Sequence, residues 1–101
     1  IGMTRVLARQ FASAQVTVNA IAPGYVWSPL WKDLGLDLAK ASRGALGANA
    51  SEVFQGRVEN LVPMGRPQTP EDIAACVAFL CSDLAKNITG QVIGVDGGIT
   101  I

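Results

Sequence analysis

Histidine is absent from this sequence, and only 16% of its residues are charged. Without histidine the chain lacks the usual general base near neutral pH and the commonest transition-metal ligand, so we expect no metal site. The eight basic residues are scattered among eight acidic ones, and the formal net charge is 0. Because no basic stripe is available to follow a phosphate backbone, we expect no nucleic-acid partner.

Long apolar runs are also missing. No stretch approaches the roughly 20 residues needed to span a bilayer, and the first residues do not resemble a secretion signal. We therefore expect a soluble, cytoplasmic protein that does not bind membranes. The only two cysteines, Cys76 and Cys81, lie about 140° apart on one predicted helix, so we expect reduced, buried packing residues rather than a disulfide or a metal site.

Apolar residues, by contrast, make up 50% of the 101 residues, which is high for so small a chain. We expect part of this apolar surface to contact another chain, most simply in a homo-oligomer. The first predicted helix, over residues 1–12, begins at Ile1 without an N-cap residue, which suggests a fragment of a longer protein.

The order of predicted elements is helix, strand, lid, helix, strand. The first strand covers residues 16–22, and its near-continuous apolar character suits a sheet covered on both faces. Residues 25–62 form a predicted substrate lid containing two short helices, because so long an irregular excursion is uncommon in a compact domain unless it covers a ligand. The second lid helix covers residues 52–61, with these side chains directed inward: Val53, Phe54, Val58 and Leu61.

The clearest helix start follows the lid. Thr69 is a predicted N-cap, Pro70 suits the first helical position, and two acidic residues follow it. We expect this helix to continue to about Asn87 or Gly90 and to bury one apolar stripe, made of Ile73, Cys76, Val77, Leu80 and Leu84. A second buried strand over residues 91–96 should run parallel to the first, since a helix separates the two in sequence.

The end of the first strand is the most informative feature. Pro23-Gly24 ends an apolar strand, and the hydroxyl of Ser28 follows four residues after the glycine. Parallel sheets present ligands with loop main chain and small polar side chains at such strand ends. Taken alone, Pro23-Gly24 is also compatible with an ordinary turn, and the Asp96-Gly97-Gly98 segment with either a tight turn or an anion-binding nest.

Three segments in this order resemble the C-terminal part of the short-chain dehydrogenase/reductase family. They read VNAIAPGYV at 18–26, MGR and PEDIA at 64–66 and 70–74, and TGQVIGVDGG at 89–98. The resemblance covers essentially the whole chain. It implies that residues 1–101 are the C-terminal segment of a single Rossmann-type domain with a doubly wound parallel α/β sheet, of which residues 16–22 and 91–96 are the sixth and seventh strands.

The resemblance also implies site residues. By analogy the nicotinamide of NAD or NADP contacts Pro23, Gly24, Tyr25, Val26 and Ser28, with Ser28 where relatives usually have threonine. Trp27, Leu30 and Trp31 would shape the substrate pocket, although either tryptophan could equally be a core or interface residue. The family's catalytic serine, its Tyr-x-x-x-Lys pair and its helix asparagine would all precede Ile1, so no catalytic residue is expected in this chain.

The predicted function is hydride transfer between NAD(P)(H) and a carbonyl or secondary alcohol. The segment from Pro23 to Trp31 is more similar to members acting on small polyols, hydroxyketones or sugars than to acyl-carrier-protein reductases. The alternative is a non-catalytic fragment or pseudoenzyme that serves in assembly or binding. A flavodoxin-like binding domain is disfavoured, because no phosphate-binding loop precedes any strand.

Overall fold

The computed structural model describes residues 1–101 and divides them into two compact units. The strand-pair unit consists of residues Ile1–Pro23 and Pro70–Val95, and the helix-pair unit of residues Gly24–Thr69 and Asp96–Ile101. The chain therefore passes from the first unit to the second directly after Pro23, at the strand end that the sequence singles out.

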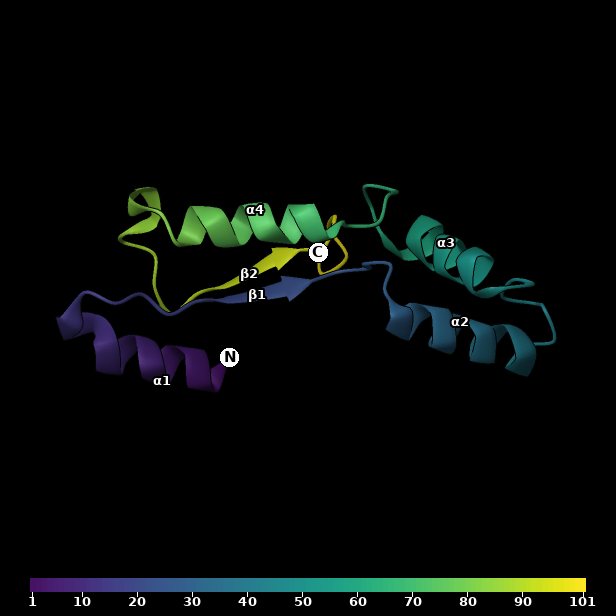
Figure 1. Cartoon of the computed structure of the whole chain (residues 1–101), viewed down its shortest axis with the longest axis horizontal. Helices are drawn as coiled ribbons and strands as arrows, with labels where there is room; N and C mark the ends of the chain where they lie inside the picture. The colour runs from purple at the N-terminus through teal and green to yellow at the C-terminus, as the bar shows by residue number, and fades with distance from the viewer. The chain divides into compact units, whose positions relative to one another are not determined.

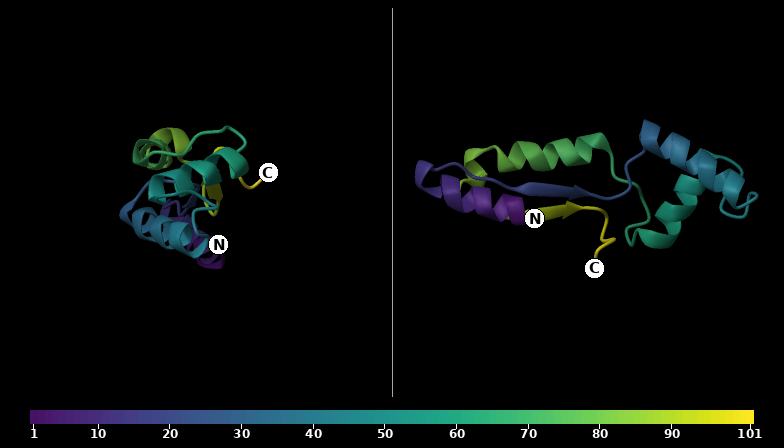
Figure 2. Two further views of the ribbon diagram at one scale, coloured as in Figure 1. Left: turned by 90° about the vertical axis from the view of Figure 1, so that its right-hand side faces the viewer. Right: turned by 90° about the horizontal axis from the view of Figure 1, so that it is seen from below.

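The strand-pair unit contains helices and a parallel sheet, which confirms the predicted α/β class. Its elements are α1 (Gly2–Phe11), the 3-10 helix η1 (Ala12–Ala14), β1 (Ala20–Pro23), α4 (Pro70–Leu80), the 3-10 helix η2 (Asp83–Ala85) and β2 (Val92–Val95). The strands pair in parallel, with Ala20 opposite Val92 and Pro23 opposite Val95. Helix α4 lies along one side of the pair and α1 on the other (Figure 1), and the view from below shows both strands running in one direction (Figure 2).

Polar side chains fix the start of this strand pair. The Asn19 amide donates to the Ile88 carbonyl at 2.9 Å and accepts from the Gln91 N–H at 3.1 Å. The Thr89 hydroxyl accepts from the Val18 N–H at 3.0 Å. These contacts occupy the main chain before Ala20, which explains why β1 is shorter than the predicted strand over residues 16–22.

Helix α4 starts at Pro70 as predicted but ends at Leu80, earlier than the sequence suggested. Ser82 ends it, because this residue is extended (φ −91°, ψ 163°) and its hydroxyl donates to the Phe79 carbonyl at 2.6 Å. The predicted apolar stripe is wrong at Val77 and Leu84, which are 45% and 84% exposed.

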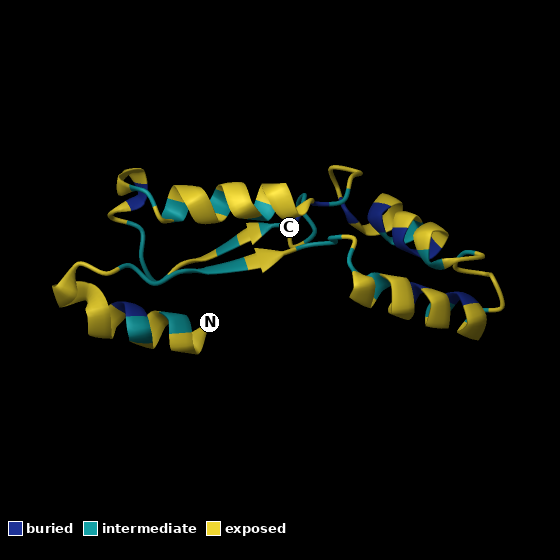
Figure 3. Cartoon of the chain, in the orientation of Figure 1, coloured by how far each residue is buried: buried dark blue, intermediate teal, exposed yellow.

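Most residues of the strand-pair unit are exposed or half-buried (Figure 3), and large apolar side chains are among the exposed ones. Its only buried apolar residues are two alanines, Ala8 and Ala85. Both cysteines are free thiols as expected, but Cys76 is half-buried and Cys81 exposed, so the prediction of two buried cysteines is wrong. None of the helices is both long and apolar enough to cross a bilayer.

The helix-pair unit contains the two helices predicted between the strands, α2 (Pro29–Ala41) and α3 (Ala50–Leu61). The two helices lie side by side and run in opposite directions (Figure 1). Gly35 is buried in α2 against the start of α3, where a Cβ atom would lie 2.8 Å from the Ala50 Cα. The glycine is thus required for the close approach of the two helices and does not interrupt α2.

Helix α3 begins two residues before the predicted start because Asn49 caps it. The Asn49 carboxamide oxygen accepts from the Glu52 N–H at 2.9 Å, and the Glu52 carboxylate accepts from the Ala48 N–H at 2.8 Å. Phe54, Val58 and Val62 form the core of this unit, with Val53 also buried. Three of the four predicted inward residues are therefore correct, whereas Leu61 is 44% exposed.

Candidate nicotinamide-facing loop

Gly24 stands where no side chain would fit. A Cβ atom at this position would lie 2.7 Å from the Asp96 Cα and would also collide with the Gln68 Oε1 atom. Since real Cβ atoms do not approach main-chain carbons so closely, the glycine is needed to bring the residues after Pro23 against the Asp96 turn.

Gln68 holds the loop that follows Gly24. Its N–H donates to the Tyr25 carbonyl at 2.8 Å, and it forms an isolated parallel bridge with Val26. The side chain is 7% exposed, and its amide donates to the Arg66 carbonyl at 3.2 Å. Its Oε1 atom is buried without a hydrogen-bond partner. Sequence reasoning missed this residue, because a glutamine in a connector carries no signal of its own.

The peptide groups of Val26 and the hydroxyl of Ser28 are uncommitted. The bridge to Gln68 uses the Tyr25 carbonyl, so the N–H and C=O of Val26 make no hydrogen bond within the chain. Ser28 is the N-cap residue of α2, yet its hydroxyl does not cap the helix. Both residues are half-buried, and the positive end of the α2 dipole lies beside the Ser28 hydroxyl.

These uncommitted groups fit a primary carboxamide. A carboxamide needs donors for its oxygen and acceptors for its NH₂ group, and Val26 offers one of each on its main chain. The Ser28 hydroxyl can donate or accept. The predicted residues Gly24, Val26 and Ser28 thus lie together in one unit, while Pro23 is the last residue of β1 in the other.

The Tyr25 side chain is half-buried and packs with the core of the helix-pair unit. Its ring lies 5.3 Å from Trp31 and 6.2 Å from Phe54, measured between centroids. It packs against the buried cluster of this unit. Only the main chain of Tyr25 is therefore positioned by the loop, and its carbonyl is already bonded to Gln68.

The two tryptophans also surround Phe54. The Trp27 and Trp31 centroids lie 5.1 and 5.3 Å from the Phe54 centroid, both edge to face with interplanar angles of 70°. Trp27 keeps 39% of its surface exposed, whereas Trp31 is half-buried in the cluster. Leu30 is 73% exposed and does not belong to the buried cluster.

Asp96 closes its own turn. Its carboxylate accepts from the Gly98 N–H at 3.0 Å and from the Thr100 hydroxyl at 2.9 Å. The hydrogen bond from Gly98, followed by that from Thr100, lowers the pKa of Asp96 below its ordinary value. Gly97 and Gly98 have φ values of 64° and 94°. Because the turn supplies its own anion, the structure favours the tight-turn interpretation over an anion-binding nest.

This geometry, a parallel strand leading into a loop of uncommitted peptide groups, is typical of nucleotide-binding α/β enzymes. The comparisons define the class further. Residues 1–100 match the family model described as enoyl-(acyl carrier protein) reductase. The chain belongs to the short-chain dehydrogenase/reductase family, as the sequence motifs indicated.

Curated relatives of this chain are dehydrogenases and reductases. The chain is 38% identical over 98 residues to L-2,3-butanediol dehydrogenase of Corynebacterium glutamicum, covering 97% of this chain and 36% of the relative. It is 38% identical over 101 residues to a 3-oxoacyl-[acyl-carrier-protein] reductase of Thermotoga maritima, covering 100% and 35%. It thus spans about a third of the length of the curated relatives it matches.

Solved structures agree. A short-chain dehydrogenase family protein from Francisella tularensis superposes with a TM-score of 0.83 at 34% identity, covering 98% of this chain and 39% of the other. L-sorbose reductase of Gluconobacter frateurii, solved with NADPH and L-sorbose, gives a TM-score of 0.84 at 28% identity, covering 98% and 36%. The predicted partial Rossmann-type fold is confirmed.

Proposed function

We propose that this chain forms the nicotinamide end and the substrate lid of an NAD(P)-dependent oxidoreductase. The observation that carries the proposal is the uncommitted Val26 peptide and Ser28 hydroxyl in a loop directly after β1. When bound, such a cofactor supplies a hydride to a carbonyl carbon or accepts one from a secondary alcohol. The acid/base groups would come from outside these residues, and the substrates would be small alcohols or carbonyl compounds.

Each part of the loop has a separate task in this proposal. Val26 and Ser28 bind the carboxamide and orient the ring, with Pro23 and Gly24 turning the chain toward it. Gln68 is a positioning residue, because its N–H fixes the Tyr25 carbonyl and so leaves Val26 free to bind. Trp27, Leu30 and Trp31 belong to the proposed lid over residues 25–62, where Trp27 and Leu30 keep exposed surface for a substrate.

The binding part of the proposal is tested by titrating the ¹⁵N-labelled chain with reduced nicotinamide mononucleotide. We expect shifts of the Val26 and Ser28 amides, a weaker titration for Ser28→Ala, and retained binding for Ser28→Thr. One lost hydrogen bond to the carboxamide corresponds to about a fivefold loss of affinity, since such a bond contributes about 1 kcal/mol. Ser51→Ala, at an exposed serine on α3, is the matched control.

Shifts confined to other parts of the chain, or equal titration of Ser28→Ala and the unaltered chain, would contradict the proposal. The catalytic part has its own assay. The purified 101-residue chain should not oxidise NADH or NADPH with acetoin or dihydroxyacetone above background. Turnover above background would show that this chain contains acid/base groups that we place outside it.

The second candidate is a non-catalytic assembly or binding module. The exposed apolar residues of the strand-pair unit favour it, above all Met3, Val6, Phe11, Phe79 and Leu84. Such surfaces commonly meet another polypeptide. Sedimentation of the purified chain tests this role. The apolar composition suggested a homo-oligomer, and a monomer at micromolar concentration would rule out such self-assembly.

A further inference from the structure

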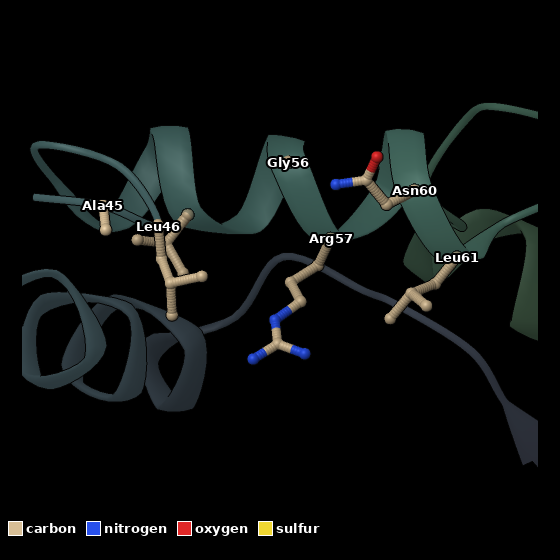
Figure 4. A pocket seen from close by; sticks show the side chains of 7 residues that line it. Ala45, Leu46, Gly56, Arg57, Asn60 and Leu61 are labelled. Atoms are coloured by element: carbon tan, nitrogen blue, oxygen red, sulfur yellow. The ribbon is translucent and has the colours of Figure 1, made fainter. Parts of the chain in front are cut away.

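A hollow lies on helix α3, within the helix-pair unit and away from Ser28 in sequence. Its volume is about 270 Å³, slightly below the roughly 300–1,000 Å³ of ordinary ligand pockets. It is lined by Ala45, Leu46, Val53, Gly56, Arg57, Asn60 and Leu61. Figure 4 shows the Arg57 side chain extending from α3 between Leu46 on one side and Leu61 on the other.

Arg57 carries a charge that nothing in the chain neutralises. Its side chain is half-buried, and it makes no hydrogen bond or ion pair. The two acidic residues of α3 are engaged elsewhere: Glu52 accepts from the Ala48 N–H at 2.8 Å, and Glu59 accepts from the Gln55 amide at 3.1 Å. No carboxylate lines the hollow.

The other lining groups complete a site for a small anion. Asn60 follows Arg57 by three residues on α3 and also lines the hollow, but its amide lies against the helix and points away from the guanidinium (Figure 4). Leu46, Val53 and Leu61 give the hollow apolar walls, of which Leu46 and Leu61 stay 46% and 44% exposed. Apolar neighbours strengthen a charge-assisted hydrogen bond. A guanidinium binds the paired oxygens of a carboxylate or phosphate in a fork-to-fork arrangement.

We propose that Arg57, in the hollow that Asn60 also lines, binds the oxyanion of the substrate, a small carbonyl compound or alcohol with a carboxylate or phosphate group. The identification of the anion as a substrate rests on the proposed function, in which α3 belongs to the substrate lid. The anion site itself rests only on the hollow and its unpaired guanidinium. It narrows the substrate class from neutral hydroxyketones to their charged counterparts.

Two matched ligand pairs test the site by NMR titration of the ¹⁵N-labelled chain, observing the Arg57 Nε–H and the Asn60 amide. One pair is dihydroxyacetone phosphate against dihydroxyacetone, and the other is acetoacetate against acetone. We expect saturable shifts with the charged member of each pair. The neutral member should bind at least about tenfold more weakly. Whichever charged ligand binds more tightly identifies the oxyanion as phosphate or carboxylate.

Three variants assign the binding to the guanidinium. Arg57→Gln should lose about tenfold or more in affinity, and Arg57→Lys should retain part of it, because lysine keeps the charge without the fork. Arg43→Gln removes an exposed arginine outside the hollow and should bind as the unaltered chain does. Unchanged Val58 and Phe54 signals in each variant show that the core is intact.

Equal titration by charged and neutral ligands, or by Arg57→Gln and the unaltered chain, would overturn the anion site. The outcome is separable from the proposed function, because the nicotinamide titration is observed at Val26 and Ser28 instead. Anion binding without nicotinamide binding would leave this site standing and refute the oxidoreductase proposal.

Discussion

The two units of this chain are held together in different ways. The helix-pair unit buries Val53, Phe54, Val58 and Val62 to 5% exposure or less and surrounds Phe54 with three aromatic rings. The strand-pair unit buries only alanines and fixes its strands through the side chains of Asn19 and Thr89. One unit therefore depends on apolar packing, and the other on directional hydrogen bonds.

This difference matters for function. The loop with Val26 and Ser28 and the hollow with Arg57 both lie in the helix-pair unit. A site attached to a packed core keeps its geometry better than one on an uncovered sheet. The proposed lid is thus a small packed body whose core also orients the nicotinamide-facing main chain.

The largest expected effect is that of Phe54→Ala, which removes the ring at the centre of the aromatic cluster. We expect about 3–5 kcal/mol of lost stability in the helix-pair unit, since the cavity cannot close around three other rings. Urea unfolding followed by tryptophan fluorescence measures it. Phe79→Ala, at a 44% exposed position on α4, is the matched control and should change stability little. Equal losses would remove the distinction between the units.

Gly24→Ala should have the next largest effect, about 1–3 kcal/mol, because the added Cβ collides with the Asp96 main chain. Thermal unfolding followed by circular dichroism measures this loss. Gly2→Ala is the control, since no atom lies within 4 Å of its added Cβ. A Gly24→Ala chain as stable as the Gly2→Ala chain would show that the loop does not need its close approach.

Asn19→Ala should cost about 1–2 kcal/mol, because the Ile88 carbonyl and the Gln91 N–H both lose their partner. The loss should appear in amide exchange of the strand pair and leave α3 unchanged. Asn87→Ala, at an exposed asparagine in the turn before β2, is the control. Faster exchange in α3 as well would indicate that the two units unfold together.

The smallest effect concerns pH. The pKa of Asp96 lies below its ordinary value of 3.8, so the native state binds its proton less readily than the unfolded chain does. The resulting stabilisation is complete above the unfolded pKa and is lost as the pH falls through the lowered native pKa. Asp96→Asn should flatten this acid dependence in the helix-pair unit, and an unchanged acid profile would contradict the role given to the carboxylate.

Local patterns predicted the elements well and their surroundings less well. Pro70 fixed the start of α4 correctly, and the spacing of Val53, Phe54 and Val58 identified the buried face of α3. The end of α4 was missed because its hydroxyl-bearing residue, Ser82, lies in an apolar run. A serine in such a run does not show whether the helix continues through it or ends at it.

Burial and long-range contacts were harder to predict. Val77 and Leu84 follow a helical stripe that is exposed here, because a stripe predicts a face and not the partner that would cover it. Gln68 and Thr89 bind segments that are distant in sequence, which local patterns do not reveal. The free hydroxyl of Ser28 was equally hard to predict, because a serine at a helix N-cap usually uses its hydroxyl to cap the helix. The aromatic roles of Tyr25 and Trp31 required the position of Phe54.

Amide hydrogen exchange tests the contrast between the units most directly, using one hydrogen-bonded amide from each. The Val62 N–H donates to the Val58 carbonyl at 3.0 Å, and the Ala20 N–H donates to the Gln91 carbonyl at 2.9 Å. Because only Val62 belongs to a packed core, we expect its amide to exchange at least about tenfold more slowly than the Ala20 amide. An Ala20 amide that exchanges as slowly as Val62 would contradict the account.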